Sequence, residues 1–323
     1  MTRSPTAPSA TPTVLLTGAT SGIGREAAQQ FAERGATVLF TGRDREAGEE
    51  VLSAVRSARP DAEGSFYRVD FADLDAVREL AREIRADYDR LDVLANNAGA
   101  SFSERHTTTA GIERAPAEGV ERTFAVNHLA PFLLTNLLAP LLRESAAVRD
   151  DGEPARVVTT ASGLHENGSL SDLDAVVRGE NFDGLDAYAD SKLANVLFTV
   201  ELADRLDGTG VTANCFHPGW LPHTGLVRNA TGFSGLFTRA ASLVAGVAPV
   251  GPFESVAGAA DALVYLATSD EVADVSGAYF DRRERATPAG AAGDADRRER
   301  LWTRSAELVG LPASVPAGDP VSE

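Results

Sequence analysis

The chain contains very little cysteine and lysine and is short of positive charge. Of its 323 residues, one is a cysteine (Cys215) and one is a lysine (Lys192), and 47 Asp and Glu oppose 30 Lys and Arg, for a formal net charge of −17. A single thiol excludes an internal disulfide and a cysteine-based metal centre, which fits a reducing compartment. The negative charge argues against nucleic acid or an anionic membrane surface as partners. We therefore expect a cytoplasmic protein that binds a small molecule and holds no metal.

Long hydrophobic runs are also scarce. The first twelve residues, MTRSPTAPSATP, lack the apolar run of a signal peptide. The longest apolar stretch, LAPFLLTNLLAPLL, is interrupted by Thr135 and Asn136. We expect it to be too short and too polar to span a bilayer, so no membrane partner is predicted.

The excess of acids has two explanations. A surface adapted to high salt carries many carboxylates, because salt screens their mutual repulsion. A GC-rich genome that prefers arginine codons would explain the missing lysine but not the excess of acids. The balance favours adaptation to salt.

Apolar periodicity alternates between strand and helix along most of the chain. Two β-rich runs bounded by glycine, 13–18 and 36–42, flank an amphipathic segment that ends at Gly35, which indicates a βαβ unit. Helices are expected at 44–58, at 73–87, around Lys192, and in a long segment that repeats apolar residues and one Asn at threes and fours: Val120, Phe124, Asn127, Leu134, Leu138 and Leu141. Further strands are expected at 65–70, 91–99, 155–162, 210–219 and 277–281. The pattern predicts an α/β fold, a doubly wound, mostly parallel, Rossmann-type sheet with helices on both faces.

No linker divides this series, so one domain is predicted over residues 13–312. The Pro- and Ser-rich ends, 1–12 and 313–323, are predicted to be disordered tails. Segment 221–250, rich in Gly, Ala and Leu, matches no element clearly.

The stretch TGATSGIG (17–24) follows the first strand and opens the first helix. Its glycines allow a tight turn and close backbone approach, and the helix N-terminus offers free N–H groups and a positive dipole to a pyrophosphate. A glycine cluster alone also suits an ordinary strand-to-helix turn. Its place in a βαβ unit favours a dinucleotide site with these cofactor-binding residues: Gly18, Thr20, Ser21, Gly22, Ile23 and Gly24.

The end of the second strand bears on the choice of cofactor. NAD enzymes usually carry an acid here, whereas this chain has Gly42 and Arg43. Because arginine binds a 2′-phosphate well, NADP is predicted in preference to NAD. The alternative is an exposed arginine paired with Asp44 or Glu46 and without a ligand. Asp70, which closes the third strand, is expected beside the adenine.

The lone lysine lies four residues after Tyr188 in a predicted helix. A hydride transfer to a carbonyl needs a proton for the developing alkoxide, and a tyrosine can supply it when a nearby cation lowers its pKa from about 10. The guanidinium of an arginine would not fit this place, which explains why a chain so rich in arginine retains Lys192. Alone, such a pair also occurs on helix surfaces.

Several motifs in order resemble the short-chain dehydrogenase/reductase family: TGATSGIG, NNAG at 96–99, VNHLAPFLLTNLL at 126–138, a serine after the fifth strand, YADSK at 188–192 and HPG at 217–219. The resemblance covers about residues 13–280 and implies a catalytic tetrad of Asn127, Ser162, Tyr188 and Lys192. In this reading Tyr188 is the general acid and base, and Ser162 orients the substrate oxygen. Lys192 lowers the pKa of the tyrosine and holds the cofactor ribose, and Asn127 fixes a water in a proton relay. Without the resemblance to this family, Asn127 would be interpreted as a polar residue that satisfies the backbone in a helix bend. Ser162 would be interpreted as a turn residue at the end of a strand.

The resemblance also implies further cofactor contacts, from Asn97, Ala98, Gly99, Tyr188, Lys192, Pro218, Gly219 and Thr224. His223 is an alternative to Thr224 beside the nicotinamide. His165 and His217 are expected to be structural histidines.

Finer motifs, among them SGLHENG and LWTRSAELVGL, resemble the retinol dehydrogenase-like and WW-domain-oxidoreductase-like branch. This resemblance implies an NADP(H)-dependent oxidoreductase that interconverts an apolar alcohol with an aldehyde or ketone. Segment 221–250 would form a substrate lid with an apolar wall: Leu221, Leu226, Val227, Phe233, Leu236 and Phe237. The alternatives are a catalytically silent dinucleotide-sensing regulator on the same fold and a nucleotide-sugar epimerase or dehydratase. A homo-oligomer is compatible with all three.

Overall fold

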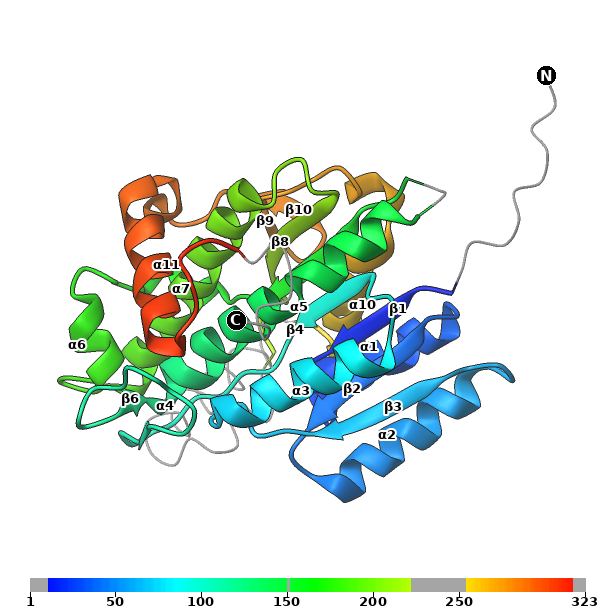
Figure 1. The fold of residues 1–323 in the computed structure, drawn as a ribbon, viewed down its shortest axis with the longest axis horizontal. Helices are drawn as coiled ribbons and strands as arrows, with labels where there is room; N and C mark the ends of the chain where they lie inside the picture. Colours follow the sequence, from blue (N-terminus) through cyan, green and yellow to red (C-terminus); the bar gives the residue numbers. More distant parts are fainter. Residues whose placement is uncertain (1–10, 150–151, 222–253, 316–323) are drawn as a thin grey trace, which may run out of the picture.

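The computed structural model describes residues 11–149, 152–221 and 254–315, in which a main sheet of eight strands is covered by helices on both faces (Figure 1). The eight strands lie in the order β10-β9-β8-β7-β4-β1-β2-β3. All neighbours pair in parallel except β9 and β10, which pair antiparallel. The predicted fold class is confirmed.

The first half of the sheet follows the predicted alternation closely. Its elements are β1 (Thr13–Leu16), α1 (Gly22–Glu33), β2 (Thr37–Gly42), α2 (Arg45–Ala58), β3 (Gly64–Arg68), α3 (Leu74–Asp87) and β4 (Val93–Asn96). Asp44 and Asp73, predicted as the first residues of two helices, are their N-caps, and each carboxylate accepts a hydrogen bond from a backbone N–H of the first turn.

The second half contains predicted elements and also elements that the sequence did not reveal. Its main elements are β7 (Ala155–Thr160), α7 (Gly184–Arg205), β8 (Val211–His217), α10 (Val256–Thr268), β9 (Tyr279–Asp281), β10 (Glu284–Ala286) and α11 (Ala295–Val309). Smaller ones are the two-stranded pair β5 (Thr107–Thr108) and β6 (Val120–Glu121), α6 (Leu173–Arg178) and the 3₁₀ turns η2 (Gly163–Asn167), η3 (Asp270–Val272) and η4 (Gly290–Gly293). Among the unpredicted elements, β10 is a polar edge strand, so its sequence carries no apolar alternation.

The long central helix differs from the prediction. It was expected to run without a break from Val120, but Val120 lies in β6, and the helix consists of α4 (Arg122–Phe124), a π-helical turn η1 (Ala125–Leu129) and α5 (Ala130–Ala147). The Glu121 carboxylate caps its start by accepting from the N–H groups of Thr123 and Phe124, at 2.8 and 2.9 Å.

The same helix corrects the prediction about membrane-spanning length. Counted from Arg122 to Ala147, it is long and apolar enough to cross a membrane by length and composition, the only such helix in the described ranges. Its most apolar window is wholly buried inside the protein, as expected for a core helix. The cytoplasmic location stays a prediction.

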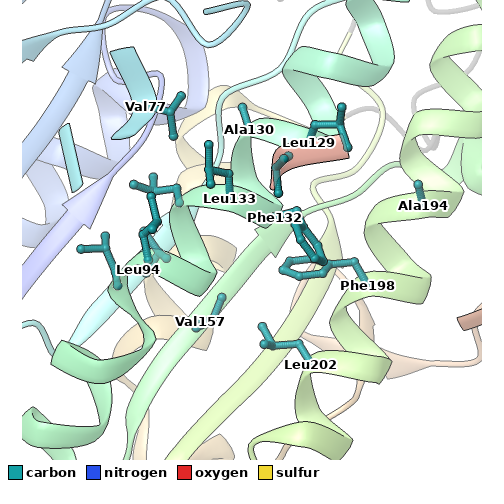
Figure 2. Close-up of a cluster of buried hydrophobic side chains, with 14 of the residues drawn as sticks. Val77, Leu94, Leu129, Ala130, Phe132, Leu133, Val157, Ala194, Phe198 and Leu202 are labelled. Atoms are coloured by element: carbon teal, nitrogen blue, oxygen red, sulfur yellow. The ribbon is translucent and has the colours of Figure 1, made fainter. Parts of the chain in front are cut away.

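The core lies on both faces of the sheet. On one face, strand residues such as Leu94 and Val157 belong to a buried cluster with residues of α3, α5 and α7 (Figure 2). Helix α11 packs against α7. On the other, their chain neighbours Val93 and Val158 belong to a second buried cluster with residues of α1, α2 and α10. Because alternate residues of each strand are buried on opposite faces, the strands are apolar throughout.

The described helices and strands lie between Thr13 and Val309, and the single domain over 13–312 stays a prediction. Most residues of the two predicted tails, 1–12 and 313–323, lie outside the described residues. At their inner ends, the Pro12 carbonyl accepts from the Thr37 N–H at 2.9 Å, and the Ala313 carbonyl accepts from Trp302 and Arg205. The described chain is therefore held slightly beyond both predicted boundaries.

The net charge of −17 predicts that stability depends on salt. Like charges repel over a Debye length of about 30 Å at 10 mM salt and about 3 Å at 1 M. We expect Tm to rise as NaCl increases between these limits, measured by thermal unfolding with KCl as a second salt. A Tm that is constant across the range would favour codon bias as the origin of the composition.

Candidate active site

The glycine loop joins β1 to α1 and is built for close approach. Gly18 and Gly22 have left-handed backbones, with φ of +68° and +54°. A Cβ on Gly18 would stand 2.8 Å from the Cα of Ala98, and one on Gly24 would stand 2.3 Å from the Gly18 oxygen. A Cβ on Gly22 would meet no described atom within 4 Å. Two of the glycines are therefore needed for packing, and the third borders open space.

The N-terminus of α1 opens onto this loop. Ser21 is the N-cap residue of α1, but its side chain makes no capping hydrogen bond within the described residues. The first turn of α1 also carries no acidic residue. Its N–H groups and positive dipole therefore stay available to an anion. Ile23 packs against the core, and Thr20 packs on Gly42, where a Cβ would stand 2.1 Å from the threonine methyl carbon. These two residues can offer a ligand mainly their backbone.

Asn97 supports the loop from behind. Its amide donates to the carbonyls of Thr17 and Gly18 at 3.0 and 3.3 Å. The Thr17 hydroxyl in turn accepts from the N–H groups of Asn97 and Ala98, both at 2.9 Å. These bonds hold the NNAG segment against the glycine loop, a role for Thr17 that no sequence motif indicated.

The ends of β2 and β3 carry two arginines without an ion pair. Within the described residues, neither Arg43 nor Arg68 has a carboxylate partner, although Arg68 Nε donates to the Arg43 carbonyl at 3.1 Å. The Asp44 carboxylate caps α2 instead, so the predicted alternative pairing of Arg43 is absent here. Sequence analysis missed Arg68, because only the pairing of β2 with β3 brings it to Arg43.

Asp70 follows β3 at the same end of the sheet. Its Oδ1 accepts from the Ala72 N–H at 3.0 Å, and its Oδ2 lies 3.6 Å from Nη2 of Arg122. The side chain remains 46% exposed, so one edge of the carboxylate is open to a ligand.

Tyr188 and Lys192 lie one turn apart on α7 and are both buried. Their exposed fractions are 8% and 3%, so they do not form a solvated surface pair. The Lys192 ammonium lies 5.6 Å from the centre of the Tyr188 ring and donates to the Thr160 carbonyl at 2.9 Å. Lys192 makes no other hydrogen bond within the described residues, so two of its three hydrogens are left for other acceptors.

Burial perturbs both groups. It lowers the pKa of Lys192 to about 8. It also raises the pKa of Tyr188 to about 12, against a hydrogen bond with Ser162 that lowers it. At neutral pH the site therefore holds an ammonium beside a neutral phenol, and the ammonium favours phenolate when the proton leaves.

Asn127 connects this pair to the loop after β4. Its Oδ1 accepts from the Ala100 N–H at 2.7 Å, and its Nδ2 donates to the Ala100 carbonyl at 2.9 Å and to the Ser191 hydroxyl at 3.0 Å. Ser191 donates to the Tyr188 carbonyl at 2.7 Å. Sequence analysis did not single out Ser191, which links Asn127 to α7. Oδ1 has the capacity to accept one more hydrogen bond.

Ser162 follows β7 as the N-cap of η2 and is held by its neighbours. Its hydroxyl accepts from the Leu164 N–H at 3.2 Å, and its carbonyl lies 2.7 Å from His165 Nδ1. The other ring nitrogen of His165 accepts from the Ala289 N–H at 3.1 Å, so Nδ1 carries the proton and donates. Both nitrogens of His165 are occupied, as expected for a structural histidine.

The end of β8 completes the described site. His217 is partly buried, and burial lowers its pKa. The buried Pro218 and the left-handed Gly219, with φ of +86°, follow it. His223, Thr224 and the predicted lid beyond Leu221 lie outside the described residues.

Comparison with known proteins decides the family. Residues 12–232 match the family model of the short chain dehydrogenases. The chain belongs to the short-chain dehydrogenase family. It is 37% identical over 309 residues to retinol dehydrogenase 13 of Mus musculus, with 93% of this chain and 84% of that protein covered.

Solved structures agree. An uncharacterized protein from Mycobacterium Paratuberculosis superposes with a TM-score of 0.68 at 28% identity, covering 96% of this chain and 97% of that one. Pseudomonas aeruginosa RhlG in complex with NADP superposes with a TM-score of 0.63 at 27% identity, covering 84% and 95%. This short-chain dehydrogenase is therefore an NAD(P)-dependent oxidoreductase that acts on alcohol and carbonyl groups of small molecules.

The residues present fit a nicotinamide dinucleotide. The loop is open at Gly22, the N–H groups at the start of α1 are available to an anion, and among the described residues the Lys192 ammonium uses only one of its three hydrogens, which leaves two for ribose hydroxyls. The NNAG segment lies against the glycine loop and also close to the Lys192 ammonium. A Cβ on Gly99 in this segment would lie 3.6 Å from Lys192 Nζ and 3.5 Å from Asn127 Oδ1.

Proposed function

We propose that this short-chain dehydrogenase uses NADP(H) to interconvert an apolar alcohol with an aldehyde or ketone. The observation that carries the chemistry is the buried ammonium of Lys192 beside the phenol of Tyr188, with the Ser162 side chain close enough to lower the pKa of that phenol. The open arginines at the ends of β2 and β3 support NADP.

The bound cofactor supplies or accepts the hydride. In reduction, the Ser162 hydroxyl holds the carbonyl oxygen, and Tyr188 donates its proton to that oxygen as negative charge develops. The Lys192 ammonium stabilises the phenolate that remains. Asn127 holds α7 against the loop after β4 and keeps an oxygen lone pair for a relay water.

The substrate class rests on the relatives. Retinol, named for the similar mouse enzyme, is an apolar alcohol. The predicted lid, which would wall an apolar cleft, lies outside the described residues, so its role stays a prediction. The direct test is a panel of aldehydes and ketones of increasing apolar size with NADPH and NADH, followed by cofactor absorbance at low and high NaCl. Turnover that increases with apolar size would support the proposal.

The regulator alternative makes the opposite prediction for the same panel. A sensor needs the glycine loop but has no use for a buried Tyr188–Lys192 pair. Cofactor binding without turnover of any panel member would favour it over the enzyme.

We expect Arg43→Asp to reverse or abolish the preference for NADPH over NADH. The new carboxylate repels a 2′-phosphate and accepts from ribose hydroxyls instead. Because Arg43 is exposed, the rise in KM for NADPH should be about tenfold, the lower range for a charge-assisted hydrogen bond. Steady-state KM values for both cofactors measure the change.

Arg56→Asp is the matched control, since it makes the same charge change at an exposed position of α2. Equal KM values for NADPH and NADH in the unaltered protein would remove the basis for the NADP proposal.

Arg68→Ala should raise the KM for NADPH and leave the KM for NADH unchanged if Arg68 binds the 2′-phosphate together with Arg43.

A further inference from the structure

His128 follows the site residue Asn127 in the π-helical turn and is fully buried. Its Nε2 lies 2.7 Å from the hydroxyl of Ser305, which is itself buried on α11, 177 residues further along the chain. The rings of Phe124, Phe132 and Phe198 surround the imidazole, with centroids at 4.9 to 6.1 Å. The contact therefore connects the C-terminal helix directly to the turn that carries Asn127.

The imidazole is neutral. Burial lowers the pKa of His128 to about 3, although the nearby Asn195 side chain acts to raise it. Asn195 lies on α7, three residues after Lys192. A neutral ring has one N–H. Nε2 is paired with the Ser305 hydroxyl, and the buried Nδ1 has no hydrogen-bond partner among the described residues.

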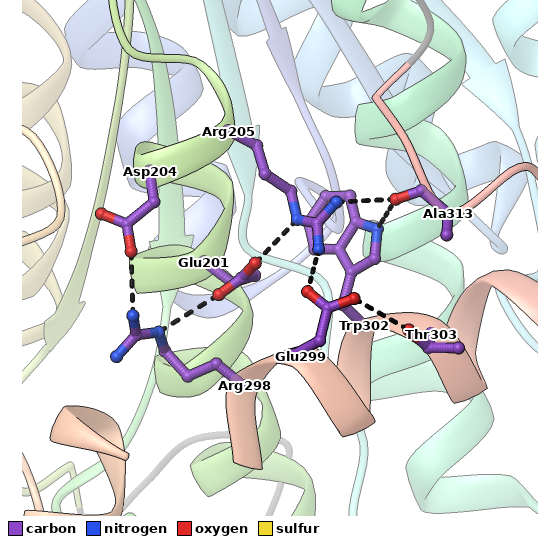
Figure 3. A network of polar contacts seen from close by, with 8 residues as sticks. All are labelled: Glu201, Asp204, Arg205, Arg298, Glu299, Trp302, Thr303 and Ala313. Atoms are coloured by element: carbon purple, nitrogen blue, oxygen red, sulfur yellow. Dashed lines mark hydrogen bonds and ion pairs between the residues drawn. The ribbon is translucent and has the colours of Figure 1, made fainter. Parts of the chain in front are cut away.

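Helix α11 is fixed against α7 by a charged network (Figure 3). Arg298 of α11 bonds to Glu201 and Asp204 of α7 at 3.3 and 2.9 Å. Arg205 of α7 bonds to Glu299 and lies 4.4 Å above the Trp302 ring. Ser305 therefore sits on a helix whose position relative to α7 is determined by several contacts.

Trp302 adds an apolar part to this attachment. Its ring stacks on Phe198 of α7, with centroids 5.8 Å apart, and meets the edge of Phe132 of α5 at 4.9 Å. Phe132 and Phe198 belong to the buried cluster next to the π-helical turn (Figure 2). The three helices thus meet around His128.

The π-helical turn needs an external restraint. Such turns are rare and occur mostly as single insertions in α-helices. Return to α-helical register would rotate neighbouring side chains by about 100°, the angle per residue of an α-helix. Asn127 would then lose its bonds to Ala100 and Ser191.

We propose that His128 is a positioning residue: its hydrogen bond to Ser305 holds the π-helical register and thereby aims Asn127 at Ala100 and Ser191. The C-terminal helix α11 is thus part of the support of the active site. This inference rests on the proposed catalytic use of Asn127.

The test uses His128→Phe, which keeps the ring volume and removes both nitrogens, and Ser305→Ala, which removes only the hydroxyl. Each is combined with Asn127→Ala in a double-mutant cycle read out as kcat. Misplacement of Asn127 should lower kcat by about 10- to 100-fold in either single variant, with KM for the cofactor nearly constant. Neither substitution should lower kcat further when Asn127 is already alanine.

Ser145→Ala is the structural control. Its hydroxyl is buried on the same long helix, accepts from the Leu91 N–H at 2.7 Å and is remote from the π-helical turn. An equal kcat loss in Ser145→Ala, or the same loss with and without Asn127, would overturn the proposal. If His128→Phe does not fold, Ser305→Ala decides alone.

Failure of the proposal differs from failure of the proposed function. If Asn127→Ala keeps full kcat, the positioning role is overturned while the oxidoreductase remains. If the unaltered protein turns over no member of the carbonyl panel, the proposed function itself fails.

Discussion

Lys192→Arg lowers kcat by about 100-fold or more, although the positive charge is retained. The ammonium occupies a buried place, 3% exposed, between the Thr160 carbonyl and the Tyr188 ring. A planar guanidinium is larger and presents its donors in a fixed fork, so it cannot replace the compact ammonium without displacing its neighbours. Steady-state kinetics at saturating cofactor measure the loss. A kcat near that of the unaltered protein would contradict the role of Lys192.

Lys192→Met separates function from stability. Burial lowers the pKa of Lys192 from 10.5 to about 8, so folding with a charged ammonium costs about 3 kcal/mol below pH 8. Between pH 8 and 10.5 the unfolded chain binds more protons than the folded one, and this cost is relieved as pH rises. The methionine variant should be inactive and yet at least as stable at pH 7. Its stability advantage should shrink as pH approaches 10.5.

The Tm of both proteins across this pH range measures the effect, and taking the difference cancels the other titrating groups. A variant that is much less stable at pH 7 would show that Lys192 stabilises the fold despite the cost of its desolvation. A difference in Tm that does not change with pH would contradict the expected effect of desolvation.

Tyr188→Phe is expected to lower kcat by about 10²- to 10⁴-fold, the range for loss of a general acid or base. The substitution removes one hydroxyl and keeps the ring in its buried place on α7. KM for the cofactor should change little, because the glycine loop and Lys192 remain. Oxidation of the alcohol should accelerate with pH in the unaltered protein, since the tyrosine must be deprotonated to act as the base.

Tyr67→Phe is the matched control. Tyr67 lies on β3, far along the sheet from α7, and burial raises its pKa as well. It should keep normal kcat. Comparable activity in Tyr188→Phe and Tyr67→Phe would exclude Tyr188 as the proton donor.

Much of the fold was predictable because its signals are local. The glycine loop, the capping aspartates Asp44 and Asp73 and the alternation of strands and helices all depend on residues within a few positions of one another. The apolar runs predicted the strands of the parallel sheet for the same reason, since each is buried on both faces.

The elements that were missed depend on distant contacts. Apolar spacing of threes and fours continues through the central helix, so the π-helical turn leaves no mark in the sequence and is set by partners such as Ser305. Strand β10 is polar and exists because it pairs with β9. Likewise, Ser191 and Arg68 gain meaning only from their contacts with Asn127 and Arg43.

The family, the glycine-rich loop and the spacing of Tyr188 and Lys192 follow from the amino-acid sequence alone, because each resides in a short run of residues. Three features follow only from the folded chain: the burial of this pair, the hydrogen bond from Lys192 to Thr160, and the lack of a carboxylate partner for Arg43 among the described residues. Desolvation and pairing depend on which strands and loops surround a group. The pKa values of the site therefore follow from the assembled fold and not from the motif.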